Sequence, residues 1–302
     1  MTDNTSNTAY EHSLLLLGTG AGDANFDLPS AAGRAAKDVR RYSSQVLSPD
    51  ILIDFNHQTA AALETFGVEA NSIRHLLISH GHYDHLQPVE ILNFAAALPQ
   101  PLPIYGNTMA CDALTFCRDN WWNPEIKRWV AKQSTFNVEL HVLKPGMSAQ
   151  VGDSKVTAVH GNHFMNVPYR IMEQQSLNFV IEIGGTTIFY GLDSSYLLPE
   201  TARILAAFRF DLAVLDATFG PLEIDPVRSG HLNWKMLDET IAELRATGSF
   251  DDDTVIVASH ISTANVEAYA DVSDQLTAKG IILAYDGLRL GLRPGKRGLG
   301  GL

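Results

Sequence analysis

Positions 80 to 85 constrain this chain more than any other stretch of its sequence. They read His80-Gly-His82-Tyr-Asp84-His85 and follow the apolar run His75-Leu-Leu-Ile, which has the pattern of a buried strand. Imidazole and carboxylate groups bind zinc, manganese or iron, and the cluster contains no cysteine. His80 and His82 can face one ion, whereas Asp84 and His85 can face a second ion after a bend. Two ions about 3.5–4 Å apart form the usual clamp for hydrolysing a phosphodiester or a polarised carbonyl, so the cluster predicts a binuclear metal site.

A third histidine for the first ion is expected farther along the chain. His163 follows an expected strand over residues 155–159 and would complete a three-histidine set with His80 and His82. His160 is the competing candidate, and we favour His163 because His160 lies closer to the body of the strand.

The second ion also needs ligands from later strands. Asp193 follows an expected strand over 186–190, and its carboxylate can bridge two cations. His260 follows an expected strand over 254–259 and is the natural final ligand. The predicted metal ligands are therefore His80, His82, Asp84, His85, His163, Asp193 and His260.

His231 stands apart from these ligands. It precedes an expected helix, which starts at Trp234, instead of following a strand. A histidine at this position is better placed to donate a proton to a leaving group, or to contact a phosphate, than to bind metal.

The expected strands and helices indicate one large unit over residues 1–302. No low-complexity or charged linker separates two domains. Both halves of the sequence contain strand-rich segments and strand–helix segments, with a hairpin signal at Gly184-Gly185. Two similar sheet-and-helix layers packed face to face would form a four-layer domain.

Two segments have a less standard pattern. The glycine-rich segment 18–23 follows a short apolar strand, but no Lys-Ser/Thr pair follows, so a tight turn lining the site is favoured over a phosphate-binding loop. The segment near 107–134 contains Trp121, Trp122 and Trp129. We predict a helical insert that packs on the core, with a lid or a substrate wall as the alternative.

The predicted ligands, in their order along the chain, resemble those of the metallo-β-lactamase-fold hydrolases. Shorter segments resemble one subgroup, which includes the tRNA 3′-processing endonuclease tRNase Z and the cyclic-phosphate phosphodiesterase of phosphonate breakdown. These segments are Leu17-Gly-Thr-Gly, Arg41-Tyr-Ser-Ser44, Leu52-Ile-Asp54, Asp216-Ala-Thr-Phe219, Gly230-His231 and Ser259-His260-Ile-Ser262. The resemblance implies an α+β four-layer αββα sandwich, the metallo-β-lactamase fold. It also implies that His231 matches the extra catalytic histidine of the phosphodiesterases.

Charge narrows the choice of substrate. The chain of 302 residues has a formal net charge of −12, which argues against a broad footprint on long nucleic acid. A small anionic substrate stays compatible, because divalent ions would make the site locally positive. The long basic arm with which tRNase Z grips tRNA has no visible counterpart, and Asp216 replaces the glutamate of the subgroup.

Composition also bears on location and partners. No apolar run approaches the roughly 20 residues of a membrane span, and the polar N-terminus shows no signal peptide, so we expect no membrane association. Two cysteines do not make a disulfide framework, and a reducing cytoplasm is the default. The Gly-rich, basic end from Arg289 to Leu302 is expected to be a solvated tail or an arm onto a partner. We also consider a homodimer.

Together these observations predict a binuclear metal-dependent phosphodiesterase that acts on a small or cyclic phosphodiester. Zinc is the expected metal, and manganese and iron suit the same ligands. In this hypothesis a metal-bridging hydroxide attacks phosphorus, Asp84 orients it, and His231 protonates the departing oxygen. The main alternative is a lactonase or thioester hydrolase on the same fold. A tRNA 3′-processing endonuclease and a metal-binding accessory protein without turnover are less favoured.

Overall fold

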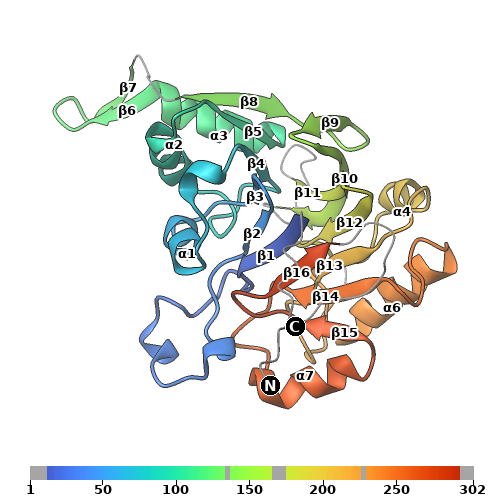
Figure 1. Cartoon of the computed structure of the whole chain (residues 1–302). Coiled ribbons are helices and arrows are strands. Elements are labelled where there is room, and N and C mark those ends of the chain that lie inside the picture. Colours follow the sequence, from blue (N-terminus) through green and yellow to red (C-terminus); the bar gives the residue numbers. More distant parts are fainter. Residues whose placement is uncertain (1–11, 133–136, 165–174, 226–228, 293–302) are drawn as a thin grey trace, which may run out of the picture.

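The computed structural model describes residues 12–132, 137–164, 175–225 and 229–292. These residues form two seven-stranded mixed sheets packed face to face (Figure 1). In spatial order, the first sheet contains β16 (Arg289–Leu292), β1 (His12–Gly18), β2 (Ser44–Leu47), β3 (Ile51–Ile53), β4 (His75–Ile78), β5 (Leu102–Gly106) and β8 (Val138–Val142). The second sheet contains β15 (Ile281–Leu283), β14 (Val255–Ser259), β13 (Leu212–Asp216), β12 (Thr186–Gly191), β11 (Gln175–Ile183), β10 (Ser154–Phe164) and β9 (Ser148–Val151).

Helices cover the outer face of each sheet. The first sheet carries α1 (Thr59–Thr65), α2 (Pro88–Ala97) and α3 (Thr108–Asp119). The second sheet carries α4 (Pro199–Leu205), α6 (Trp234–Ala246) and α7 (Tyr269–Thr277). This arrangement confirms the predicted four-layer αββα sandwich. Among the described residues, no helix combines the length and the apolar character that a membrane span requires.

The leucine run of β1 shows why both faces of a sheet are apolar in this fold. Leu14 and Leu16 pack in the core between the two sheets, whereas Leu15 and Leu17 pack toward the helices. Successive side chains of a strand point to opposite faces, and here neither face reaches solvent. All four leucines are therefore buried.

Strand direction brings the functional loops to one edge of the sandwich. In the first sheet β3, β4, β5 and β8 run parallel, and in the second sheet β12, β13, β14 and β15 run parallel. Ligand sites of open α/β sheets form outside the carboxyl ends of such strands. The loop after β4 contacts the loop after β14 there, with His85 Nε2 3.3 Å from His260 Nε2.

The predicted insert near 107–134 is helical only in its first part. After α3, the strands β6 (Asn120–Asn123) and β7 (Arg128–Ala131) form an antiparallel hairpin that projects from the body (Figure 1). All three tryptophans of the predicted insert lie on this hairpin, so the prediction of a helix is wrong for them. Aromatic side chains favour extended backbone, and the Asn-Pro pair at 123–124 favours a turn.

Two strand boundaries also differ from expectation. β10 continues through His160 to Phe164 because β11 pairs with it on both sides of a bulge, so His163 lies within the strand instead of after it. Arg289–Leu292, predicted as the start of a solvated tail, form β16 and pair with β1. The remainder of the predicted tail, 293–302, lies outside the described residues.

The core between the sheets should depend strongly on Phe179. This side chain is fully buried there, beside the ring of Tyr190. Phe179→Ala leaves a cavity, so we expect it to lower the free energy of unfolding by about 3–5 kcal/mol. Urea-induced unfolding followed by circular dichroism measures this change. Leu222→Ala, at a side chain that is 46% exposed, is the control and should change stability by less than about 0.5 kcal/mol. Equal stabilities for the two variants would contradict the prediction.

Candidate metal centre

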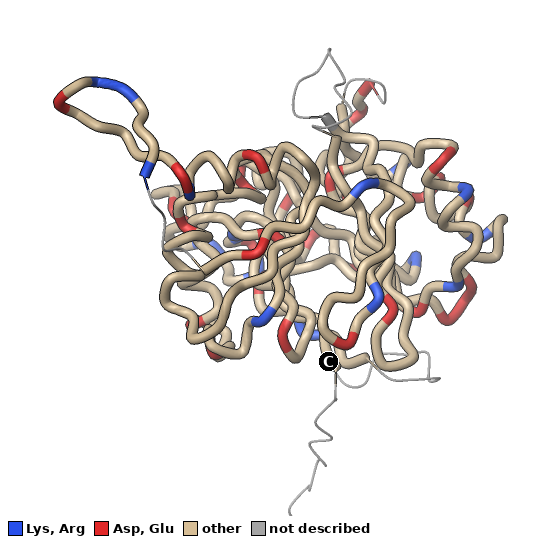
Figure 2. Tube along the Cα trace, turned by 90° about the horizontal axis from the view of Figure 1, so that it is seen from above, with Lys and Arg blue, Asp and Glu red and all other residues tan. Residues whose placement is uncertain are grey.

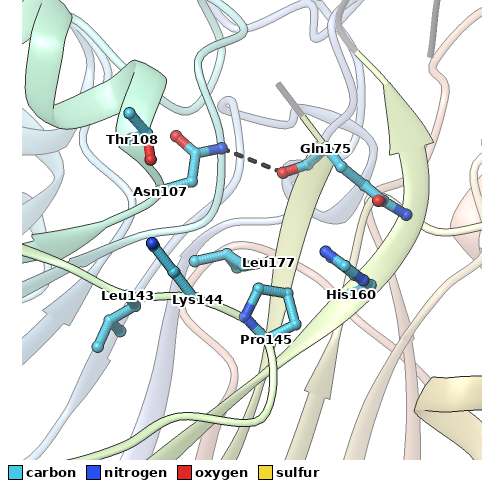
Figure 3. A pocket seen from close by; sticks show the side chains of 8 residues that line it. All are labelled: Asn107, Thr108, Leu143, Lys144, Pro145, His160, Gln175 and Leu177. Atoms are coloured by element: carbon cyan, nitrogen blue, oxygen red, sulfur yellow. Dashed lines mark hydrogen bonds between the residues drawn. The ribbon is translucent and has the colours of Figure 1, made fainter. Parts of the chain in front are cut away.

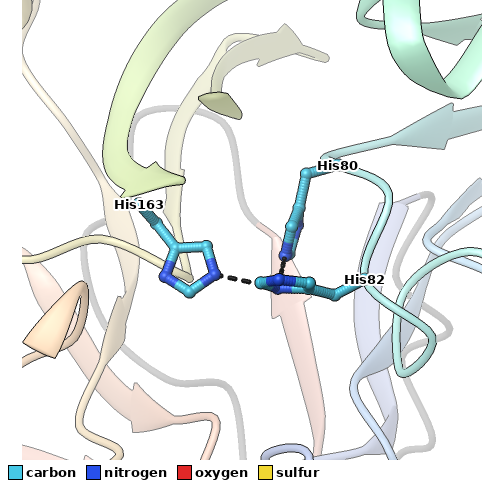
Figure 4. Close-up of side chains that lie close together, drawn as sticks. All are labelled: His80, His82 and His163. Atoms are coloured by element: carbon cyan, nitrogen blue, oxygen red, sulfur yellow. Dashed lines mark hydrogen bonds between the residues drawn. The ribbon is translucent and has the colours of Figure 1, made fainter. Parts of the chain in front are cut away.

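Three histidines from the two sheets converge on one point (Figure 4). His82 Nδ1 lies 2.9 Å from His80 Nε2 and 3.0 Å from His163 Nε2. Asp193 Oδ1 lies 3.8 Å from both of those Nε2 atoms. Zn–N bonds of about 2.0–2.1 Å separate tetrahedral ligand atoms by roughly 3.3–3.4 Å. The four atoms are therefore spaced to surround one ion.

A second group of four atoms lies directly beside the first. His85 Nε2 is 3.5 Å from Asp84 Oδ2 and 3.1 Å from Asp193 Oδ2. His260 Nε2 is 3.6 Å from Asp84 Oδ2 and 3.3 Å from Asp193 Oδ2. Asp193 thus presents Oδ1 to the first group and Oδ2 to the second. The structure brings all seven predicted ligands together.

The chemistry of this cluster fits bound cations. Asp193 is 1% exposed, and its Oδ2 is buried without a hydrogen-bond partner. Such an oxygen is costly to bury unless a cation or a donor compensates it. Among the described residues, five groups have the spacing of a metal site, and the seven predicted ligands are contained in three of them: His80 with His82 and His163, His80 with His85 and Asp193, and Asp84 with His85 and His260.

Hydrogen bonds to outer groups determine which ring nitrogen faces the cluster. Asp54 Oδ2 accepts from His85 Nδ1 at 2.7 Å, so the proton of His85 is on Nδ1. Ser79 Oγ donates to Asp54 Oδ2 at 2.9 Å and therefore accepts from His80 Nδ1 at 3.0 Å. Both rings consequently turn Nε2 toward the cluster, and a histidine binds metal through such a nitrogen when it is unprotonated.

The two histidines of the second sheet are oriented in the same way. His163 Nδ1 donates to the Gly230 carbonyl at 3.0 Å. Gly230 has φ of 66°, and a Cβ there would lie 2.6 Å from His163 Nδ1, so glycine is needed for this approach. Thr218 Oγ1 donates to the His260 carbonyl and accepts from His260 Nδ1, both at 2.8 Å. Nε2 of each ring is again left for the cluster.

Backbone conformation marks the same region. Four non-glycine residues among those described have positive φ, and three belong to the site: Asp54 at 59°, Asp193 at 52° and His260 at 59°. His260 directly follows β14, and Asp193 lies two residues beyond the end of β12. Asp and His tolerate this conformation better than most residues, and the strain is typical of functional sites.

Electrostatics support the same interpretation. Burial lowers the pKa of His80 well below its usual value and that of His163 to about 3, so both rings stay neutral. Burial alone would also lower the pKa of His85, but the carboxylates of Asp193, Asp84 and Asp54 raise it well above its usual value. The carboxylates therefore stabilise positive charge at the position that a cation would take.

His231 lies beside both ligand groups and bonds to Asp216. Its Nδ1 donates to Asp216 Oδ2 at 2.8 Å, and its ring stacks on His260 with centroids 5.2 Å apart. Asp216 Oδ1 accepts from the backbone N–H groups of Leu232 and Thr218, which holds the carboxylate in place. Burial lowers the pKa of His231, but Asp216 outweighs it and raises that pKa above its usual value. Spacing alone would also allow His231 as a ligand, but each of the two groups already has four candidate ligand atoms without it.

A pocket of about 370 Å³ opens over this cluster. Five of the seven predicted ligands line it, and Tyr83 and Phe219 supply aromatic walls. Residues 21–23 of the glycine-rich turn line it, as the sequence predicts, and Asp23 accepts hydrogen bonds from Ser262 Oγ and the Ala264 N–H. The turn is thereby tied to the loop that carries His260.

His160, the competing ligand candidate, lies in a different pocket. That pocket has a volume of about 250 Å³, and Figure 3 shows His160 across it from Asn107 and Lys144. The three-residue advance from His160 to His163 crosses the bulge in β10, which carries His163 alone into the cluster. The choice of His163 agrees with this placement.

Sequence reasoning did not assign a role to several residues that hold the ligands. Asp54, Ser79, Asp216 and Thr218 act only through hydrogen bonds to site histidines. One feature of the sequence could have indicated a role for Asp54 and the Asp216-Ala-Thr segment. Both belong to segments that resemble the phosphodiesterase subgroup.

Comparison with known proteins agrees with this geometry. A family model described as a beta-lactamase superfamily domain matches residues 48–261, more than half of the chain. The chain belongs to the metallo-β-lactamase superfamily. Among curated proteins, none matches the sequence.

Solved structures of metallo-β-lactamase-fold proteins match almost the whole chain. Zinc-bound PqqB from Methylobacterium extorquens gives a TM-score of 0.68 at 17% identity, over 93% of this chain and 100% of that one. A diphosphatase from the PhnP family gives 0.66 at 19% identity, over 93% and 98%. The short form of human tRNase Z gives 0.63 at 20% identity, over 92% and 98%. At these identities the likeness establishes the fold alone, and with the family match it confirms the resemblance to metal-dependent hydrolases of this fold.

The two histidines of β10 allow a matched test of the ligand set. We expect His163→Ala to lower metal affinity by more than about 10-fold, since it removes a ligand from the first group. His160→Ala should leave metal binding unchanged, because its ring lies in the other pocket. Metal content after equilibrium dialysis, read by mass spectrometry, measures both. Loss of metal from His160→Ala with retention in His163→Ala would reverse the assignment.

Proposed function

We propose that this superfamily member hydrolyses a small or cyclic phosphodiester at a binuclear metal site. The observation that carries the proposal is the His231–Asp216 pair, which places a proton-bearing ring next to both ligand groups without making it a ligand. A phosphodiester with a poor leaving group needs such a donor, because an unprotonated alkoxide departs slowly from phosphorus.

The metal ligands of the proposal are the seven residues predicted from the sequence. His80, His82 and His163 would hold one ion, Asp84, His85 and His260 the other, and Asp193 both. Two bound divalent ions would supply a nucleophile at neutral pH and neutralise charge on the phosphoryl oxygens. Nitrogen and oxygen ligands alone suit zinc, and the zinc in the structure of PqqB is consistent with it, although manganese and iron suit the same atoms.

Asp84 and His231 are the proposed catalytic residues. Asp84 lines the pocket and can accept a hydrogen bond from the attacking water, which orients the water toward phosphorus. His231 also lines the pocket. Since Nδ1 is held by Asp216, Nε2 is the atom that can give its proton to the departing oxygen.

Pocket size and charge favour a small substrate. The described walls enclose about 370 Å³, within the range of roughly 300–1,000 Å³ typical of small-molecule sites. The net charge of −12 disfavours the backbone of a long nucleic acid. A diphosphatase of the PhnP family has the same fold, and this likeness supports phosphate-ester chemistry for the present protein.

Side-by-side assays test the proposed reaction. Metal-loaded protein is offered bis-p-nitrophenyl phosphate, a 2′,3′-cyclic nucleotide and an acyl lactone, each with and without a chelator. Chelator-sensitive hydrolysis of the two phosphodiesters supports the proposal. Hydrolysis of the lactone alone would replace it with the lactonase alternative.

His231→Ala should separate catalysis from metal binding. We expect a fall of about 10²–10⁴-fold in kcat for a diester with a poor leaving group, because the proton donor is lost. The fall should be smaller for bis-p-nitrophenyl phosphate, whose leaving group departs without protonation, and metal content should stay unchanged. His141→Ala, at a histidine of β8 outside the site, is the control. Full activity of His231→Ala on the poor-leaving-group diester would rule out this role.

A further inference from the structure

The hairpin formed by residues 120–131, the tryptophan hairpin, carries several large apolar side chains that the fold leaves exposed. Its three tryptophans are 43–51% exposed, and its tip residue Ile126 is 50% exposed. The hairpin projects away from the body in both views (Figures 1 and 2). None of its residues lines the pocket over the metal ligands, so it does not form a wall of that pocket.

Part of the hairpin is preorganised. Trp122 and Trp129 are directly paired across the strands, with ring centroids 5.9 Å apart. The ring of Phe116, from the end of α3, packs edge-on against Trp129 at 5.1 Å. These three rings make one apolar ridge, whereas Trp121 and Val130 form the pair beside them. Rigid aromatic side chains of this kind are typical anchors of protein interfaces.

A two-stranded hairpin with both faces in water is marginally stable at best. Its contacts with the other described residues include those with α3, through the Phe116 ring and the bond from the Lys132 N–H to the Asp119 carbonyl. A further partner would therefore stabilise it. Five large apolar side chains here are 43–51% exposed, which indicates that the partner is a protein surface: Phe116, Trp121, Trp122, Ile126 and Trp129.

Charge on the hairpin is opposite to that of the body. The hairpin carries Lys127 and Arg128 against Glu125, a net charge of +1 (Figure 2). Since the whole chain has −12, the residues outside the hairpin have a net charge of −13. A basic, aromatic hairpin is thus complementary to the acidic surface of another copy of the same chain. A nucleic acid would contact the same hairpin but would be repelled by the acidic body.

The exposed area also suits a dimer. A large aromatic side chain presents roughly 150–250 Å², so about half of that from each of five side chains gives roughly 400–500 Å² per hairpin. Two hairpins and the surfaces they cover would bury roughly 1,600–2,000 Å², the size of a standard protein interface. Under two-fold symmetry each hairpin contacts the other copy, and the assembly closes as a dimer.

We propose that the tryptophan hairpin of each chain packs on the acidic body of a second copy, forming a symmetric homodimer. The dimer is independent of the reaction proposed above, since it involves none of the metal ligands and neither catalytic residue.

Sedimentation equilibrium of the full chain, across a dilution series, tests the proposal. We expect a dimer that Trp122→Ala/Trp129→Ala weakens by roughly 100-fold or more, as loss of two anchor residues should. Lys127→Glu/Arg128→Glu should also weaken it, most strongly at low salt, while leaving the aromatic ridge in place. Leu222→Ala, at a similarly exposed apolar side chain outside the hairpin, is the matched control and should leave the dimer unchanged.

Fluorescence gives a second readout because three of the four tryptophans lie on the hairpin. Dimer formation should shift their emission to shorter wavelength as the concentration rises. A folded protein that stays monomeric throughout would overturn the proposal, as would a dimer that neither double variant weakens. A monomer that binds single-stranded RNA through Trp122 and Trp129 would assign the hairpin to nucleic acid instead.

Discussion

Burial of several carboxylates around histidine rings is the interaction on which this site depends. His85 lies among Asp54, Asp84 and Asp193, all buried, and these acids together demand positive charge. Asp54 accepts hydrogen bonds from the His85 ring and the Ser79 hydroxyl. The other two acids face the centre of the cluster, where divalent cations would balance them.

Hydrogen bonds to groups outside the cluster fix the orientation of its histidine rings. Serine, threonine, aspartate and a glycine carbonyl hold the Nδ1 atoms of four histidines, so that their Nε2 atoms point inward before any ion binds. Such preorganisation lowers the cost of binding because the rings lose little further freedom. The ligands come from both sheets, so the apolar core between the sheets also holds the two halves of the site together.

Different parts of the molecule serve different functions in this account. The edge of the two sheets holds the seven candidate ligands. His231 and Asp216 supply the proposed proton donor and thus favour phosphodiesters. The tryptophan hairpin lies on an outer layer, away from the pocket, where an interface can form without altering the chemistry.

The sequence by itself was enough to predict the types of the candidate ligands, most of their order along the chain and the fold class. His80 to His85 could be interpreted locally, because four ligand-type side chains within six positions have little other use. Asp193 and His260 could be predicted because they follow strands whose parallel carboxyl ends meet at one edge.

Only the tertiary structure decided between His160 and His163, since a bulge in β10 changes which side chain reaches the cluster. It alone also revealed the hydrogen bond of Asp54 with His85, which joins residues 31 positions apart, and the hairpin that exposes the tryptophans. Hydrogen bonds and strand pairing between distant segments depend on packing in three dimensions, and local sequence patterns do not contain that information.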